Sequence, residues 1–163
     1  MTHRWKPSVT VAAVIERNGR FLLVEEHTPE GLMLNNPAGH LDPSESLVDA
    51  VVRETLEETM HGFTPTALVG TYMARFRRPL ADGTVDDITY LRFAFCGTLG
   101  AIVAGRSLDH GIERTLWMTP DELRACPQRH RSPMLMRCVD DYTRGQRFAL
   151  DTMYTDPSVY ANA

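Results

Sequence analysis

The chain has 163 residues, a length that one ordinary domain accounts for and that makes a second independent domain unexpected. Its 17 Lys and Arg residues against 21 Asp and Glu residues give a formal charge of −4, which excludes an overall basic field that would draw it to nucleic acid or an anionic membrane. Hydrophobic residues at 43% and charged residues at 23% exclude a wholly disordered or low-complexity chain and predict a folded core.

The sequence predicts a cytoplasmic protein with no membrane or nucleic-acid partner. Glu16 and Glu25 end the longest apolar runs before either could span a bilayer, and no apolar stretch follows the charged first residues as in a secretory signal. Cys96, Cys126 and Cys138 form no CxxC pair and indicate thiols in a reducing compartment. The sequence leaves the oligomeric state open, and a monomer is compatible with it.

Two short β-type runs come first in the chain. Residues 9–15 and 21–24 are rich in Val, Leu and Ile, and they flank Asn18-Gly19, a dipeptide typical of tight hairpin turns. This pattern predicts a β-hairpin. Pro, Gly and Asn residues over 29–43 then predict a loop.

A helix is predicted to begin near Ser44 or Ser46. Ser46 and Asp49 have the spacing of a capping box, and no Pro or Gly interrupts the following residues until Gly62. Gly62 is therefore the expected stop signal.

The second half of the chain alternates between strand and helix signals. Strands are predicted over 67–76, 88–99 and 116–118, and helices over 119–125, where Thr119-Pro120 is a start signal, and over 133–142. We expect a single domain over residues 1–150 and an irregular C-terminal tail over residues 151–163. This mixed order predicts an α/β fold in which helices cover a sheet.

Three carboxylates share one face of the long predicted helix. Glu54, Glu57 and Glu58 stand at positions i, i+3 and i+4, which are neighbours on a helix surface. Ala50 occupies the same sector one turn before Glu54, and Leu47 occupies it two turns before. The carboxylates therefore continue a stripe that begins as core.

Like charges at this spacing repel one another, and turning them toward a packed face adds a desolvation cost. A hard divalent cation with oxygen ligands would relieve both, and Mg²⁺ is typically held by a few carboxylates while it bridges to phosphates. The alternative is a solvated acidic helix face with Arg53 as its local partner. The carboxylate pattern alone leaves both interpretations open.

Around this helix, six residues stand at fixed spacing over twenty positions: Gly39, Glu45, Arg53, Glu54, Glu57 and Glu58. This arrangement resembles the Nudix box of the Nudix hydrolases, and so many fixed positions make it a specific signal. The resemblance implies a Nudix-type α/β/α sandwich in which the box helix packs on a mixed β-sheet.

Three positions depart from the family pattern. The family has an aliphatic residue at Thr55, a glycine at Met60 and an aliphatic residue at His61, whereas this chain has its glycine at 62. We expect from this difference that the helix runs one turn further and that the loop after it differs.

The resemblance implies a Mg²⁺-dependent enzyme, with Mn²⁺ as an alternative ion. Glu57 and Glu58 would be metal ligands, the Gly39 carbonyl a further one, and Glu54 a ligand, the general base, or both. Gly39 would leave its carbonyl accessible to the ion because it carries no side chain. Glu45 and Arg53 would form a structural ion pair that fixes the loop to the helix.

Two residues outside the box are further candidates. Some Nudix enzymes take their base from a loop near a later strand, which makes Glu113 a candidate base, although a solvated loop acid is the alternative for it. Arg92 is a candidate for binding substrate phosphates, because a guanidinium fork matches their geometry. The histidines show no metal-ligand spacing.

Several segments are similar to the NudJ-type phosphatase branch of the family, over about residues 5 to 150. These segments are Lys6–Ala12, Pro37–Leu41, Leu91–Phe93, Arg131–Pro133 and Gly145–Arg147. The branch implies release of orthophosphate from nucleoside tri- and diphosphates or from the thiamin pyrimidine pyrophosphate. The alternatives are a Nudix pyrophosphohydrolase acting on a nucleotide sugar, dinucleoside polyphosphate or oxidised nucleotide, and a non-catalytic ligand sensor. In each case the partner is a small phosphorylated metabolite or nucleotide.

Overall fold

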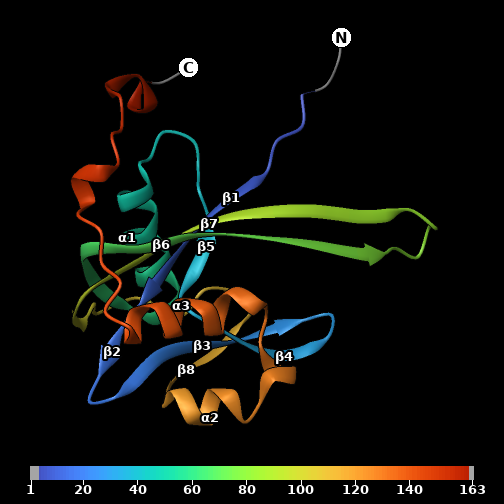
Figure 1. Cartoon of the computed structure of the whole chain (residues 1–163), viewed down its shortest axis with the longest axis horizontal. Helices are drawn as coiled ribbons and strands as arrows, with labels where there is room; N and C mark the ends of the chain where they lie inside the picture. The colour runs from blue at the N-terminus through green and yellow to red at the C-terminus, as the bar shows by residue number, and fades with distance from the viewer. Residues whose placement is uncertain (1–3, 162–163) are drawn as a thin grey trace.

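The computed structural model describes residues 4–161, which form two sheets with helices packed around them (Figure 1). The strands are β1 (Ser8–Val14), β2 (Glu16–Arg17), β3 (Arg20–Thr28), β4 (Gly31–Asn35), β5 (Ala38–His40), β6 (His61–Pro79), β7 (Val85–Ile102) and β8 (Ile112–Met118). The helices are α1 (Leu47–Thr59), α2 (Pro120–Arg124) and α3 (Pro133–Thr143), with 3₁₀ turns η1 (Pro127–Arg129), η2 (Leu150–Thr152) and η3 (Pro157–Tyr160).

One sheet is mixed and has the order β5-β1-β7-β6. Strand β1 runs parallel to β7 and antiparallel to β5, while β6 and β7 form a long antiparallel pair. The second sheet has the order β2-β3-β4, with β8 paired to β3 on its other side. The predicted α/β class with a mixed sheet is confirmed.

The two faces of β1 pack into different parts of the core. Val11 and Ala13 belong to a cluster with Ala50 and Val51 of α1, whereas Ala12 and its neighbours pack with residues of α2 and α3. Helices therefore cover the mixed sheet on both sides, as the sandwich requires. None of the helices in the described part of the chain has the length and apolar character that a bilayer crossing needs.

The predicted hairpin is right in its turn and wrong in its pairing. Asn18 and Gly19 both have positive φ, 53° and 75°, as a tight turn of this kind demands. Only β2 on the N-terminal side of this turn pairs with β3, whereas β1 joins the mixed sheet. The reason is burial: β1 is apolar on both faces from Val11 onward, which suits a central strand between β5 and β7.

Helix α1 begins as its capping box predicts. Ser46 is the N-cap, its hydroxyl accepts a hydrogen bond from the Asp49 N–H at 3.0 Å, and its own N–H donates to the Asp49 carboxylate at 3.1 Å. Thr55, where the family has an aliphatic residue, is fully buried, and its hydroxyl donates to the Val51 carbonyl at 2.7 Å. The buried hydroxyl is thus satisfied within the helix.

The expected extra turn of this helix is wrong. The helix ends at Thr59, and Met60 adopts the left-handed conformation, with φ 62°, and donates its N–H to the Leu56 carbonyl at 2.9 Å. Met60 therefore takes the capping role for which glycine is best suited, and β6 begins at His61, before Gly62.

Strands β6 and β7 are much longer than the predicted 67–76 and 88–99. They extend as a two-stranded arm beyond the rest of the sheet (Figure 1). Ion pairs across the arm join Arg75 to Asp87 at 2.6 Å and Arg78 to Asp86 at 3.1 Å. These cross-strand charge pairs support strand structure beyond the predicted bounds, in residues 77–79 and 85–87.

The C-terminal elements match their predictions closely. Thr119 caps α2 through a capping box, and α3 covers residues 133–143. The segment after Leu150 contains two 3₁₀ turns. It also contacts the domain, because Met153 packs against the cluster on the α1 side of the sheet and the Tyr160 hydroxyl donates to Asp49 at 3.0 Å.

Replacement of Met60 by glycine is expected to stabilise the protein. Glycine removes a left-handed penalty of about 1–2 kcal/mol, while the greater entropy of its unfolded chain costs about 0.5–1 kcal/mol, which leaves a net gain of up to about 1.5 kcal/mol. Urea unfolding measures the difference. Met73→Gly, the same change at an exposed strand position, is the control and should destabilise; a loss of stability in Met60→Gly would contradict the capping role.

Candidate active site

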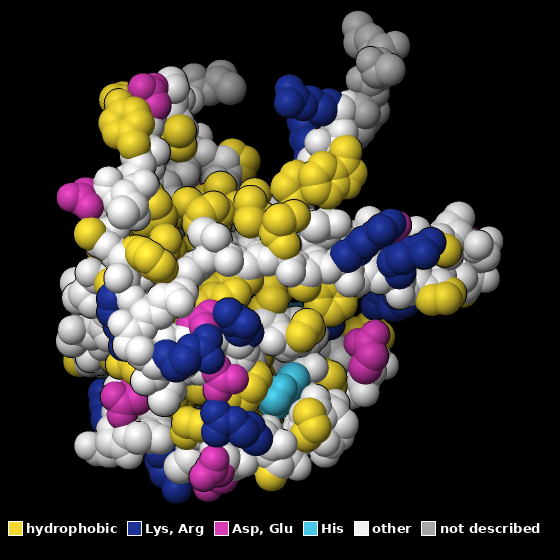
Figure 2. Space-filling model, in the orientation of Figure 1, with side chains coloured by type: hydrophobic (Ala, Val, Ile, Leu, Met, Phe, Trp, Pro, Cys, Tyr) yellow, Lys and Arg dark blue, Asp and Glu magenta, His cyan; other side chains and the backbone are white. Residues whose placement is uncertain are grey.

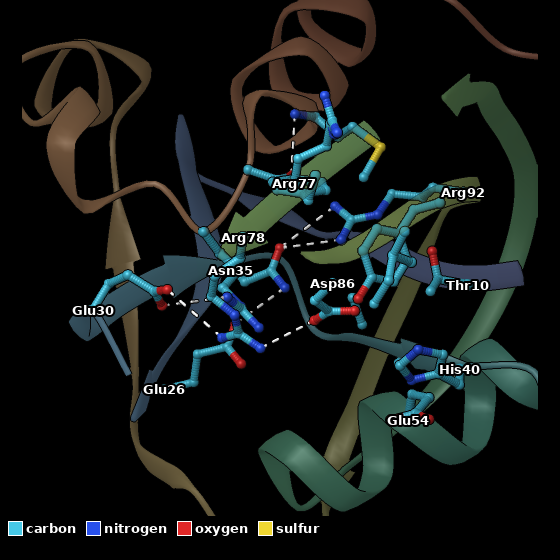
Figure 3. A pocket seen from close by; sticks show the side chains of 18 of the residues that line it. Thr10, Glu26, Glu30, Asn35, His40, Glu54, Arg77, Arg78, Asp86 and Arg92 are labelled. Atoms are coloured by element: carbon cyan, nitrogen blue, oxygen red, sulfur yellow. Dashed lines mark hydrogen bonds and ion pairs between the residues drawn. The ribbon is translucent and has the colours of Figure 1, made fainter. Parts of the chain in front are cut away.

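A cavity of about 550 Å³ opens where the β6–β7 arm, β5, α1 and the start of α3 come together (Figure 3). Helix α1 contributes Glu54 and Glu58 to its wall, and β5 contributes Gly39 and His40. Arg77, Arg78, Arg92 and Arg131 line it from other elements. The cavity thus combines carboxylates on one side with guanidinium groups on the others.

Arg53 joins the loop before α1 to the carboxylates of the helix. Its Nε and Nη2 donate to the two carboxylate oxygens of Glu45 at 3.0 and 2.7 Å, and Nη2 also donates to the His40 carbonyl at 2.9 Å. Its Nη1 donates to Glu54 at 2.7 Å and to Glu57 at 3.0 Å. The predicted ion pair of Glu45 and Arg53 is present, and hydrogen bonding by Arg53 holds the pKa of Glu45 below its usual range.

Gly39 leaves the space that the Glu54 carboxylate occupies. A Cβ atom at position 39 would overlap the carboxylate carbon and both carboxylate oxygens of Glu54. The sequence analysis linked Gly39 to access to its own carbonyl, and the structure adds this steric reason. The Glu54 carboxylate therefore lies directly against the backbone of β5.

Glu58 is the most deeply buried of the three carboxylates, with 9% of the residue exposed. It accepts a hydrogen bond from the Ala38 N–H at 2.8 Å, yet burial raises its pKa to about 9. Burial also raises the pKa of Glu54, against the opposing effect of Arg53. A divalent cation would reverse this balance, because it favours the ionised form of each carboxylate beside it.

The donor set fits a hard divalent cation in its chemistry: carboxylate oxygens of Glu54, Glu57 and Glu58 on one helix face, with a backbone carbonyl at Gly39. Within residues 4–161, however, no three His, Cys, Asp or Glu side chains are arranged as ready-made metal ligands. Glu57 lies outside the cavity lining, and its carboxylate shares one guanidinium nitrogen of Arg53 with Glu54. For all three carboxylates to bind one cation, the side chains of Glu54 and Glu57 would have to rotate away from Arg53.

The two candidates outside the box have different positions. Arg92 lines the cavity and is 5% exposed, with both Nη atoms 3.4 Å from the side-chain amide oxygen (Oδ1) of Asn35. Glu113 lies on β8, outside the cavity lining, and its half-exposed carboxylate is 2.9 Å from Nε2 of His27. The structure therefore groups Arg92, but not Glu113, with Glu54 and Glu58.

The polar residues of the cavity that were missed from the sequence include Thr10, Glu26 and Asn35. Thr10 interrupts the apolar run of β1, which is the one signal that could have singled it out. Asn35 was assigned to a loop but is the last residue of β4, with 7% exposed. The pKa of Glu26 is raised by burial, and its place in the cavity depends on strand pairing that local sequence does not reveal.

Comparisons with known proteins agree with this architecture. The family model described as "NUDIX domain" matches residues 4–138. "Phosphatase NudJ" of Escherichia coli strain K12 is 34% identical over 147 residues, which cover 90% of each chain. A NUDIX hydrolase from Nitrosomonas europaea is 46% identical, with a TM-score of 0.81 over 93% of this chain and 98% of that chain. A MutT NUDIX hydrolase from Burkholderia pseudomallei, 22% identical, shares the fold with a TM-score of 0.63, over 84% of this chain and 98% of that chain.

The raised pKa of Glu58 predicts how stability depends on pH in the absence of metal. Because the folded state holds this proton more tightly than the unfolded chain, the contribution of Glu58 to stability is complete below about pH 4.5 and is lost as the pH rises toward about 9. Glu58→Gln cannot ionise and keeps an acceptor for the Ala38 N–H. We expect it to gain stability relative to the wild type as the pH rises, by about 1 kcal/mol or more at pH 8.

Urea unfolding in EDTA at a series of pH values measures this difference. Glu122→Gln, at an exposed carboxylate of α2, is the control and should not gain stability as the pH rises, because a hydrogen bond from the Thr119 N–H holds the pKa of Glu122 below its usual range. A stability difference between Glu58→Gln and the wild type that stays constant with pH would contradict the assignment.

Proposed function

Since the chain belongs to the Nudix family and is a hydrolase acting on phosphorus-containing anhydrides, we propose that it is a Mg²⁺-dependent phosphatase of NudJ type. Its substrates would be nucleoside tri- and diphosphates or the thiamin pyrimidine pyrophosphate, from which it would release orthophosphate. The observation that carries the proposal is the packing of Glu54 and Glu58 against β5 in a cavity that is also lined by arginines.

The carboxylates of α1 would hold the ion. Glu57 and Glu58, together with the Gly39 carbonyl, would supply oxygen ligands, and Mn²⁺ has similar enough preferences to replace Mg²⁺. When bound, the ion would neutralise phosphate oxygens and lower the pKa of the attacking water. Arg53 would keep the helix and the preceding loop in register during the reaction.

Glu54 would take the proton from the attacking water. Its carboxylate lines the cavity, and burial raises its pKa, which suits a group that must accept a proton. Glu113 is the weaker candidate for this role because its carboxylate contacts His27 outside the cavity lining.

The location of the protein would be the cytoplasm. All three cysteines are free thiols, and two of them, Cys96 and Cys138, are buried in the core. Free cysteines with a packing role are typical of proteins in a reducing compartment.

Removal of a ligand carboxylate is expected to abolish most of the activity. Glu57→Gln and Glu58→Gln should each lower kcat for Mg²⁺-dependent hydrolysis by about 100-fold or more, because neutral amides are poor ligands for a hard cation. Release of orthophosphate from a nucleoside triphosphate measures the loss. Glu122→Gln removes a carboxylate of α2 outside the cavity and should retain activity. Retention of wild-type kcat by both ligand variants in an active enzyme would refute the metal assignment. Wild-type turnover with Mg²⁺ that stays at background and is no better than that of Glu57→Gln would favour a ligand sensor.

The products separate the phosphatase from a pyrophosphohydrolase. We expect a panel of phosphorylated metabolites with Mg²⁺ to yield orthophosphate without added pyrophosphatase. Release of a nucleoside monophosphate without orthophosphate would instead identify a pyrophosphohydrolase. Its second product would be pyrophosphate from an oxidised nucleoside triphosphate, a sugar phosphate from a nucleotide sugar, or a second nucleotide from a dinucleoside polyphosphate. That result would reject the NudJ-type assignment and leave the hydrolase class intact.

A further inference from the structure

Arg92 differs from the other arginines of the cavity in lacking a carboxylate partner. Arg77 pairs with Asp87, Arg78 with Asp86 and Glu30, and Arg131 with Glu26 and Glu30, whereas none of the ion pairs found within residues 4–161 involves Arg92. Arg92 is also the most deeply buried of the four. The part of the chain that the structure describes therefore places no carboxylate within ion-pair distance of Arg92.

The hydrogen bonds of Arg92 are equally incomplete. Both Nη atoms approach the same Asn35 oxygen at 3.4 Å, which is long for a charged donor, and the buried Nε has no partner (Figure 3). The Cys138 thiol beside it does not neutralise the charge, because burial raises the pKa of that thiol to about 11. At least one strong donor of Arg92 thus remains unused.

Thr10 provides a second unused donor next to Arg92. The two residues are directly paired between the parallel strands β1 and β7, and Thr10 is also paired with His40 of β5. The Thr10 hydroxyl is buried without a partner, and its residue lines the same cavity. Strand pairing therefore sets His40, Thr10 and Arg92 in one row across the sheet, with neighbouring strands about 4.8 Å apart.

An unpaired buried cation is unfavourable for the fold alone, since an apolar side chain of similar volume would avoid the desolvation cost. Both residues line the cavity, although the Thr10 hydroxyl and the Arg92 Nε are themselves buried. A phosphate, whose oxygens accept several hydrogen bonds at once, suits such a cation and hydroxyl. The carboxylates of α1 form the opposite electrostatic end of the same cavity. A substrate with two phosphoryl groups could place one beside Arg92 and the other beside a cation held by those carboxylates.

We propose that Arg92 and Thr10 bind a phosphoryl group of the substrate, separate from the group that is attacked beside the α1 carboxylates. This inference rests on the proposed function for the identity of its ligand, a molecule with a phosphoanhydride bond. Arg92 is then a specificity-determining residue, which favours substrates that carry a second phosphoryl group over monophosphates.

The test combines the stability of the free protein with the binding of anions in the absence of metal. Arg92→Met keeps much of the side-chain volume and removes the charge. Its thermal midpoint should equal or exceed that of the wild type, while its affinity for inorganic pyrophosphate in EDTA, measured by calorimetry, should fall by about tenfold or more. Thr10→Val should weaken the same binding by about threefold to tenfold.

Arg75→Met is the matched control, because Arg75 lies on the same arm, outside the cavity lining, and pairs with Asp87. It should leave pyrophosphate affinity unchanged. Inorganic phosphate and pyrophosphate are also compared with Mg²⁺ present, which separates the sources of the ligand: weaker binding of phosphate than of pyrophosphate supports a site that takes part of a larger anion. Equal binding of both by the wild type would show a site for the free product and overturn the role in substrate selection.

Steady-state kinetics separate failure of this inference from failure of the proposed function. In an active enzyme, Arg92→Met should raise KM for a nucleoside diphosphate by about tenfold or more. If Arg92→Met lowers the thermal midpoint but leaves pyrophosphate affinity and KM unchanged, Arg92 is a structural residue and the inference is wrong. A wild type that binds no pyrophosphate would also overturn the proposed site. A wild type that binds pyrophosphate but hydrolyses no phosphoanhydride with Mg²⁺ would reject the proposed function alone.

Discussion

The guanidinium of Arg53 holds the carboxylate face of α1 against the loop that precedes the helix. One side chain satisfies Glu45, Glu54, Glu57 and the His40 carbonyl, so helix and loop cannot move independently without breaking several charged hydrogen bonds. The same contacts reduce the repulsion between neighbouring carboxylates. Arg53 therefore stabilises the fold and fixes the positions of the Glu54 and Glu57 carboxylates.

Strand β5 provides the second attachment between helix and sheet. It has only three residues, and it uses an N–H at Ala38 to bind Glu58 and the bare Cα of Gly39 to admit Glu54. Both contacts bury carboxylates that would be easier to accommodate in water, as their raised pKa values show. Burial of these carboxylates therefore lowers the stability of the metal-free protein, and a bound cation would offset that loss. Titratable groups with such shifted pKa values are typical of functional sites.

The mixed sheet supplies the remaining chemistry of the cavity. A parallel pairing between β1 and β7 places Thr10 beside Arg92, and the long β6–β7 arm brings further arginines to the rim, where acidic neighbours neutralise them. Figure 2 shows basic and acidic side chains interspersed over the face of the molecule that it presents. The positive charge of the cavity that lacks an ion-pair partner is consequently that of the buried Arg92, whereas the arginines of the arm are paired with acidic residues.

Local sequence was sufficient for the features that depend on residues close in the chain. The capping box set the start of α1, and helical periodicity placed Glu54, Glu57 and Glu58 on one face, because both follow from spacings of three and four residues. The tertiary structure alone decided that β1 leaves its hairpin for the mixed sheet, that Met60 ends the helix, and that Thr10 lies beside Arg92. These outcomes depend on which strands pair and on where the chain must turn to pair them, and segments some eighty residues apart carry no local signal of that pairing.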